Sequence, residues 1–221
     1  MAIEGAVNNV IVTIEKRMIA DLYNAIRMAN MTPEGHVNPA DYVNIIGTVV
    51  ALPRSVCKRP DYAGFSTKDL RVGDTIIFSY QVVFSMDEGE NGEAVHTNAF
   101  FYEGKEYWKV DVQQIFAAIR GNEIIMINGY VMLQEVHAPS QIILLSDESK
   151  KMVRASKSFL SHIGNNLDGK KNVRAAQGDT VYIDFRKAQH YKIGERPIAI
   201  VRQKDIYAVE VGGYNPMKLI N

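Results

Sequence analysis

The chain has 221 residues, 47% of them hydrophobic, and its 25 basic residues balance its 25 acidic ones. This length suits one large domain or two of about 100 residues each, and a formal net charge of zero gives no overall attraction to nucleic acid or to an anionic membrane. With one cysteine, no secretory signal and no apolar run near the ~20 residues of a membrane span, the sequence predicts a soluble, cytoplasmic protein with no membrane partner.

Short β-branched segments dominate the first half of the chain. Residues 9–14, 45–52, 75–84 and 95–102 are predicted strands. Asn91 and Gly92 both accept positive φ, which is typical of a hairpin turn. We therefore expect residues 79–102 to form a long β-hairpin with an acidic tip.

One segment departs from the strand pattern. Residues 17–30 have apolar side chains at helical spacing, which predicts one inserted amphipathic helix. Its apolar positions are Ile19, Leu22, Tyr23 and Ile26.

The second half again has a strand pattern. Residues 124–135, 158–163, 180–185, 198–202 and 206–211 are predicted strands, and residues 212–221 are a predicted tail. Residues 140–157 have a mixed pattern.

Two motifs occur twice, in the same order. Val-Gly-Asp-Thr-Ile-Ile-Phe at 72–78 matches Gln-Gly-Asp-Thr-Val-Tyr-Ile at 177–183, and residues 110–118 match 201–209. Before each pair come a strand, a long polar segment and a glycine-bounded strand. The sequence therefore predicts a tandem duplication in an all-β protein, with small β-barrels over residues 1–121 and 122–211.

In order and content, these motifs resemble the GroES-type co-chaperonin domain, over nearly the whole chain. The Gly-Asp strands and the closing segment at 204–209 match the two best-preserved signals of that family. The tandem arrangement is similar to the double-domain co-chaperonins of plastids. The resemblance implies two GroES-like β-barrels, the second with a mobile loop at 140–155.

Members of this family insert a hydrophobic tripeptide of the mobile loop into a groove of a chaperonin ring. Ile142, Ile143 and Leu144 stand at the matching place. Three consecutive aliphatic side chains in a polar loop would be exposed unless a partner covered them. The alternative is an ordinary strand at 141–145 that packs on its own barrel.

The first copy departs from the family pattern. The predicted helix at 17–30 replaces its mobile loop, and the roof segment at 53–68 is long, with basic residues and the anchors Tyr62 and Phe65. The helix could be a fixed docking element, with Ile19, Leu22, Tyr23 and Ile26 in contact with a partner. The alternative is a lid that closes the end of the barrel.

We find no pattern that indicates catalysis. The five histidines lack metal-ligand spacing, Cys57 has no identifiable partner base, and no phosphate-binding glycine motif occurs. We expect no catalytic residue, metal site, cofactor or small-molecule substrate.

Two functions remain open at this point. The first is a co-chaperonin-like cap that associates with itself and docks on a chaperonin ring. The second is a structural protein of a phage particle, either a capsid auxiliary protein or a ring component, assembled in the host cytoplasm. Nucleic acid is not an expected partner.

Overall fold

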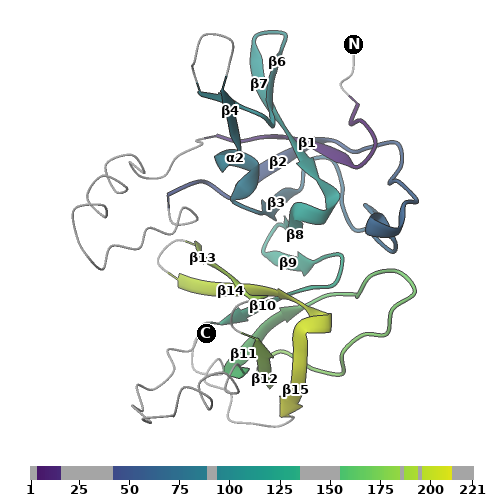
Figure 1. The fold of residues 1–221 in the computed structure, drawn as a ribbon, viewed down its shortest axis with the longest axis vertical. Helices are drawn as coiled ribbons and strands as arrows, with labels where there is room; N and C mark the ends of the chain where they lie inside the picture. The colour runs from purple at the N-terminus through teal and green to yellow at the C-terminus, as the bar shows by residue number, and fades with distance from the viewer. Residues whose placement is uncertain are drawn as a thin grey trace, which may run out of the picture. The chain divides into compact units, whose positions relative to one another are not determined.

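The computed structural model describes residues 4–15, 42–88, 94–134, 155–184, 187–193 and 196–210. The chain divides into two compact units, Met1–Ile124 and Ile125–Asn221, a few residues after the boundary predicted from the sequence. Both are built on antiparallel β-sheet (Figure 1), which agrees with the all-β class expected from the sequence.

The first unit carries a seven-stranded sheet in the order β6-β7-β1-β2-β3-β8-β9, whose last strand continues past the end of the unit at Ile124. A separate two-stranded sheet pairs β4 with β5. The elements, in chain order, are β1 (Asn9–Thr13), β2 (Ile46–Ala51), η2 (Pro60–Tyr62), β3 (Thr75–Phe78), α2 (Gln81–Phe84), β4 (Met86–Glu88), β5 (Ala94–His96), β6 (Ala99–Tyr102), β7 (Lys105–Asp111), η3 (Val112–Gln114), β8 (Ile115–Arg120) and β9 (Glu123–Met126).

The second unit carries a six-stranded sheet in the order β13-β14-β10-β11-β12-β15. Its elements are β10 (Tyr130–Gln134), β11 (Ala155–Ile163), β12 (Thr180–Asp184), β13 (Gln189–Ile193), β14 (Arg196–Arg202), η5 (Gln203–Asp205) and β15 (Ile206–Glu210).

The two sheets share one strand order. Six consecutive strands of the first sheet, from β6 to β8, match the six strands of the second, position by position. The irregularities match as well, because the shift between Ile11 and Val12 in β1·β2 recurs between Met132 and Leu133 in β10·β11. A second shift recurs in β3·β8 and β12·β15. The sequence motifs that occur twice therefore occupy equivalent places.

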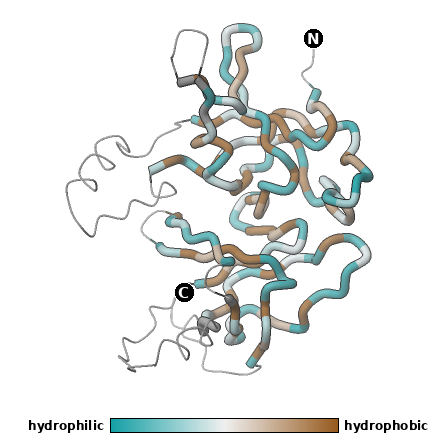
Figure 2. Tube along the Cα trace, in the orientation of Figure 1, coloured by the Kyte–Doolittle hydropathy of each residue, from teal (hydrophilic) through white to brown (hydrophobic). Residues whose placement is uncertain are grey.

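Burial explains why these segments are strands. Val10 and Val12 in β1, and Val131 and Leu133 in β10, are fully buried at the centre of their sheets. Hydrophobic segments follow the strands of both sheets in Figure 2. A central strand has neighbouring strands on both sides. β-Branched side chains therefore pack better in a central strand than in an exposed edge strand. The core of the second unit is formed by Val131, Leu133, Leu160, Val181, Ile183, Ala199 and Val201.

A tight turn precedes the first strand of each repeat. Asn8 has φ 70°, and Asn128 and Gly129 have φ 52° and 76°. The predicted strand at 124–135 was therefore wrong as a single element, since this turn divides it into β9 and β10. Asn-Gly is a strong turn signal because both residues tolerate the left-handed region.

The predicted hairpin over residues 79–102 was also wrong as one element. The run at 75–84 ends as a strand at Phe78 and continues as the one-turn helix α2, which buries Val82 and Val83. Only β4 and β5 pair with each other, whereas β6 pairs with β7. A continuous apolar run does not distinguish a strand from a buried helical turn, which is why periodicity failed here.

Gly164 directly follows β11, at a place where its backbone lies close to the backbone of Met126. A Cβ atom at this position would stand 1.9 Å from the carbonyl oxygen of Met126. We expect Gly164→Ala to lower the free energy of unfolding by about 2–3 kcal/mol, because backbone must shift to relieve the overlap. Urea unfolding measures this change.

Gly169 provides the matched control. Its φ is +79°, but a Cβ atom there would meet nothing within 4 Å. Gly169→Ala should cost only the strain of a left-handed alanine, about 1 kcal/mol. Equal effects of the two substitutions would contradict the close approach at Gly164.

Candidate functional site

The residues predicted to bind a partner lie outside the described part of the chain. Ile142, Ile143 and Leu144 fall between β10 and β11, and the predicted helix at 17–30, with Ile19, Leu22, Tyr23 and Ile26, falls between β1 and β2. These two connections are equivalent in the repeat, since both join its first strand to its second. The structure therefore describes the framework from which both candidate segments start.

The framework is fixed by a Gly-Asp turn before the third strand of each repeat. Gly73 and Gly178 have φ of 92° and 90°. Their N–H groups donate to Val49 O and Leu160 O, at 2.8 Å in both cases. A left-handed conformation without a Cβ penalty is what glycine supplies.

The aspartate of each turn closes it with a side-chain hydrogen bond. Asp74 Oδ2 accepts from the backbone N–H of Arg71, and Asp179 Oδ2 accepts from that of Ala176, both at 2.8 Å. The backbone C=O of each aspartate then accepts from the second strand, at Val49 and Leu160. The two motifs therefore perform the same task, which is to join the second strand to the third.

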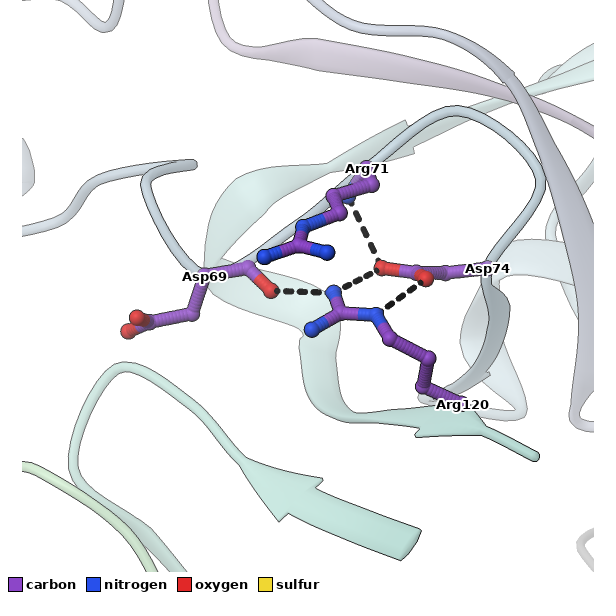
Figure 3. Close-up of polar contacts among 4 residues, drawn as sticks. All are labelled: Asp69, Arg71, Asp74 and Arg120. Atoms are coloured by element: carbon purple, nitrogen blue, oxygen red, sulfur yellow. Dashed lines mark hydrogen bonds and ion pairs between the residues drawn. The ribbon is translucent and has the colours of Figure 1, made fainter. Parts of the chain in front are cut away.

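In the first unit the turn gains an ion pair (Figure 3). Arg120, at the end of β8, donates from Nε to Asp74 Oδ1 at 2.9 Å and from Nη2 to Oδ2 at 2.7 Å. Nη2 also donates to Asp69 O at 3.2 Å. Asp74 is buried, and its bond to Arg120 is the main reason that its pKa lies below the ordinary value. Bidentate pairs of this kind are strong and directional.

The connection between β2 and β3 is tied to the rest of the first unit. Tyr62, in η2, donates its hydroxyl to Asp111 Oδ2 at 2.5 Å, which raises the pKa of Tyr62. The backbone N–H of Cys57 donates to Asn8 Oδ1 at 2.6 Å. Phe65 packs edge-on to Tyr62, with ring centroids 6.4 Å apart. The two aromatic anchors of the roof segment therefore lie together.

The equivalent connection in the second unit is held by one buried glutamine. Gln203 donates from Nε2 to Gly164 O at 2.7 Å, and its Oε1 accepts from the backbone N–H of Val173 at 2.9 Å. Its own N–H donates to Gly129 O at 2.8 Å. Sequence reasoning missed Gln203, whose equivalent in the first repeat is the apolar Val112.

Arg202 is a second residue that sequence reasoning missed. It donates to Asn128 O at 2.9 Å and to the Tyr130 hydroxyl at 2.7 Å, and it lies over the Tyr130 ring at 3.8 Å. Burial lowers the pKa of its guanidinium. The equivalent residue in the first unit is Asp111, so the two repeats stabilise this position with opposite charges.

Metal-binding side chains do not gather in the described part of the chain. No group of three or more His, Cys, Asp or Glu side chains that could hold a metal occurs among the described residues. His96 Nδ1 lies 2.9 Å from Val83 O, and His162 Nδ1 lies 2.9 Å from Ser161 Oγ. Burial lowers the pKa of His162. The described residues thus form a hydrogen-bonded framework from which the two long connections start.

No helix in the described ranges is long and apolar enough to cross a membrane. No protein-family model and no curated protein sequence matches the chain. The function is therefore inferred from the chain's own residues and from the repeat.

Removal of Arg120 tests the ion pair. We expect Arg120→Ala to lower the free energy of unfolding by about 2–3 kcal/mol, because a buried carboxylate loses its charged partner. Thermal and urea unfolding measure the loss. Arg59 is the control, since it is exposed, its contact with Asp61 is long, at 3.9 Å, and its guanidinium lies 5.9 Å from the centroid of the Tyr62 ring. Arg59→Ala should therefore change stability by less than about 1 kcal/mol.

The same pair predicts a pH dependence. The pKa of Asp74 is lowered in the folded protein, so its contribution to stability is complete above its unfolded pKa of about 4 and is lost as the pH falls through the folded pKa. The stability difference between the wild type and Asp74→Asn should therefore shrink as the solution is acidified below about pH 4. A difference that stays constant with pH would exclude a charged Asp74 as its source.

Proposed function

We propose that this chain is a non-enzymatic, tandem GroES-like protein that docks on a large protein assembly as a co-chaperonin-like cap. The observation that carries the proposal is the repeat, with two motifs of the GroES type in the same order in each half. One strand order in both sheets supports the duplication on which the resemblance depends. Closure of each sheet into a GroES-like barrel is part of the proposal.

The docking contact in this proposal is made by Ile142, Ile143 and Leu144. They stand between the first and second strands of the second repeat, where the family resemblance places its mobile loop. Burial of each side chain in a groove of the partner would stabilise the complex by about 1.5–3 kcal/mol. Self-association into a ring would multiply such contacts and raise the avidity.

The connection between β1 and β2 is proposed as a second contact, of a different kind. It would present Ile19, Leu22, Tyr23 and Ile26 on an amphipathic helix. The competing role for this helix is a lid on its own barrel. The two roles predict different effects on the stability of the isolated protein. Only a lid would pack its apolar residues against the rest of the folded chain and so contribute to its stability.

The first proposed contact can be tested by changing the three aliphatic residues to serine together. We expect the triple variant to lose association with a chaperonin ring in a pull-down with ATP, since most of the buried apolar area of the contact is removed. Val72→Ser is the control, because Val72 is a 64% exposed valine elsewhere in the chain. Unchanged binding by the triple variant would remove the proposed contact.

The helix is tested with Ile19→Ser together with Leu22→Ser. Loss of binding with unchanged thermal stability would support a docking element. A fall in thermal stability with retained binding would support a lid.

A structural role in a phage particle is the second candidate. Two observations favour it. The connection between β1 and β2 has no clear Ile-x-Leu tripeptide, and the first unit carries the additional β4–β5 pair, which has no equivalent among the described residues of the second. Negative-stain imaging with and without chaperonin and ATP separates the candidates. Rings that cap a chaperonin support the first, and a protein that ignores chaperonin supports the second.

A further inference from the structure

Strand β6 ends the sheet of the first unit and has an unusual surface for an edge strand. Among the described residues, no strand pairs with its outer side. Its sequence is Ala-Phe-Phe-Tyr, and Phe101 is 75% exposed. Edge strands of natural proteins commonly carry a lysine, a proline or a bulge that prevents pairing, and β6 has none of these.

The second repeat supplies an internal comparison. Strand β13 is the equivalent edge, and its register with β14 places Lys192 where β6 has Phe101. Lys192 is exposed, as expected for a protected edge. Phe101 therefore stands where the equivalent edge strand of the same chain has a lysine, and β6 lacks the charge that protects β13 from pairing.

The pairing of β6 with β7 shows which backbone N–H and C=O groups of β6 point away from β7. Asn98 O accepts from Lys109 N at 2.9 Å, and Ala99 is paired with Trp108. Because hydrogen-bonded and non-hydrogen-bonded pairs alternate in antiparallel sheet, Asn98, Phe100 and Tyr102 bond to β7. The N–H and C=O groups of Ala99 and Phe101 then face the free edge.

We propose that this edge pairs with the same edge of a second copy of the chain, so that two β6 strands form a continuous antiparallel sheet. Residues directly opposite each other in a sheet point to the same face. The twofold axis between two β6 strands must therefore lie midway between the two copies of one residue, so that this residue is opposite itself. An axis at Phe100 pairs Ala99 with Phe101 of the second copy, and Phe101 with Ala99. This register uses all four outward groups of each strand.

Neighbouring registers fit less well. An axis at Ala99 would place Phe101 opposite Thr97, whose N–H already donates to Ser85 O. An axis at Phe101 would place Ala99 opposite Glu103, which lies in the turn with φ 49° and outside β6. An axis at Phe100 sets Phe101 beside the small Ala99 and brings the two Phe100 rings together, next to the stacked Tyr107 rings. Aromatic cross-strand pairs stabilise sheet pairing, and β6 has no charge that would oppose a like charge.

The expected dimer is weak, because a four-residue edge buries much less than the area of a typical stable interface. We therefore expect the measured mass to rise from that of one chain towards that of two as the protein concentration increases. The inference is independent of the proposed function, since it concerns neither of the two long connections.

Sedimentation velocity over a range of concentrations tests the pairing with the full-length protein. We expect the wild type to dimerise and Phe101→Lys, which copies the residue of β13, to lose dimerisation or to halve the mass of any larger assembly. Val72→Lys is the matched control, an exposed valine in the same unit, and should behave as the wild type. Circular dichroism establishes that each variant is folded.

A cross-link tests the register separately. In the proposed register the two Phe100 residues are a non-hydrogen-bonded pair with Cα atoms about 4.5 Å apart, close enough for a disulfide. Phe100→Cys, in a Cys57→Ser background, should give a covalent dimer on mild oxidation. A wild type that stays monomeric at its solubility limit, a mass unaffected by Phe101→Lys, or a dimer without the cross-link would overturn the inference.

Discussion

Both halves of this protein depend on one local constraint, a glycine with positive φ followed by an aspartate that closes its own turn. The glycine brings the chain close enough for its N–H to bond to the second strand, and the aspartate accepts a backbone N–H three residues earlier. Without this turn the second and third strands would not be joined in register, and the long connections between the first and second strands would lose their fixed base.

The two units show how a repeated framework can diverge. The strand order and the registers are the same, but the polar interactions added to them differ. The first unit reinforces its turn with Arg120 and ties its roof segment through Tyr62 and Asp111. The second unit uses Gln203 and Arg202 instead. Each set of interactions gives hydrogen-bond partners to buried polar groups, which would destabilise the folded state if they had none.

Much of the framework could be predicted from the sequence, for physical reasons. The Gly-Asp turns and the closing segments depend on local residue types, and their order fixed the repeat. Elements whose identity depends on tertiary context were missed: α2 lies in a run as apolar as a strand, and β13 carries polar residues on an exposed edge. Gln203 and Arg202 gave no signal, because a single polar residue does not reveal its burial. The predicted docking residues lie outside the described part of the chain and stay predictions.

The shared strand order creates a hazard for folding, because each strand has a plausible but incorrect partner in the other half of the same chain. Backbone hydrogen bonding does little to prevent a strand from pairing in the wrong half, since the registers of the two sheets agree. The side chains discriminate: β7 buries Trp108 completely at the position where β14 has Ala199. A core shaped around alanine has no room for an indole ring, so the difference in volume between the two cores keeps each half with its own strands.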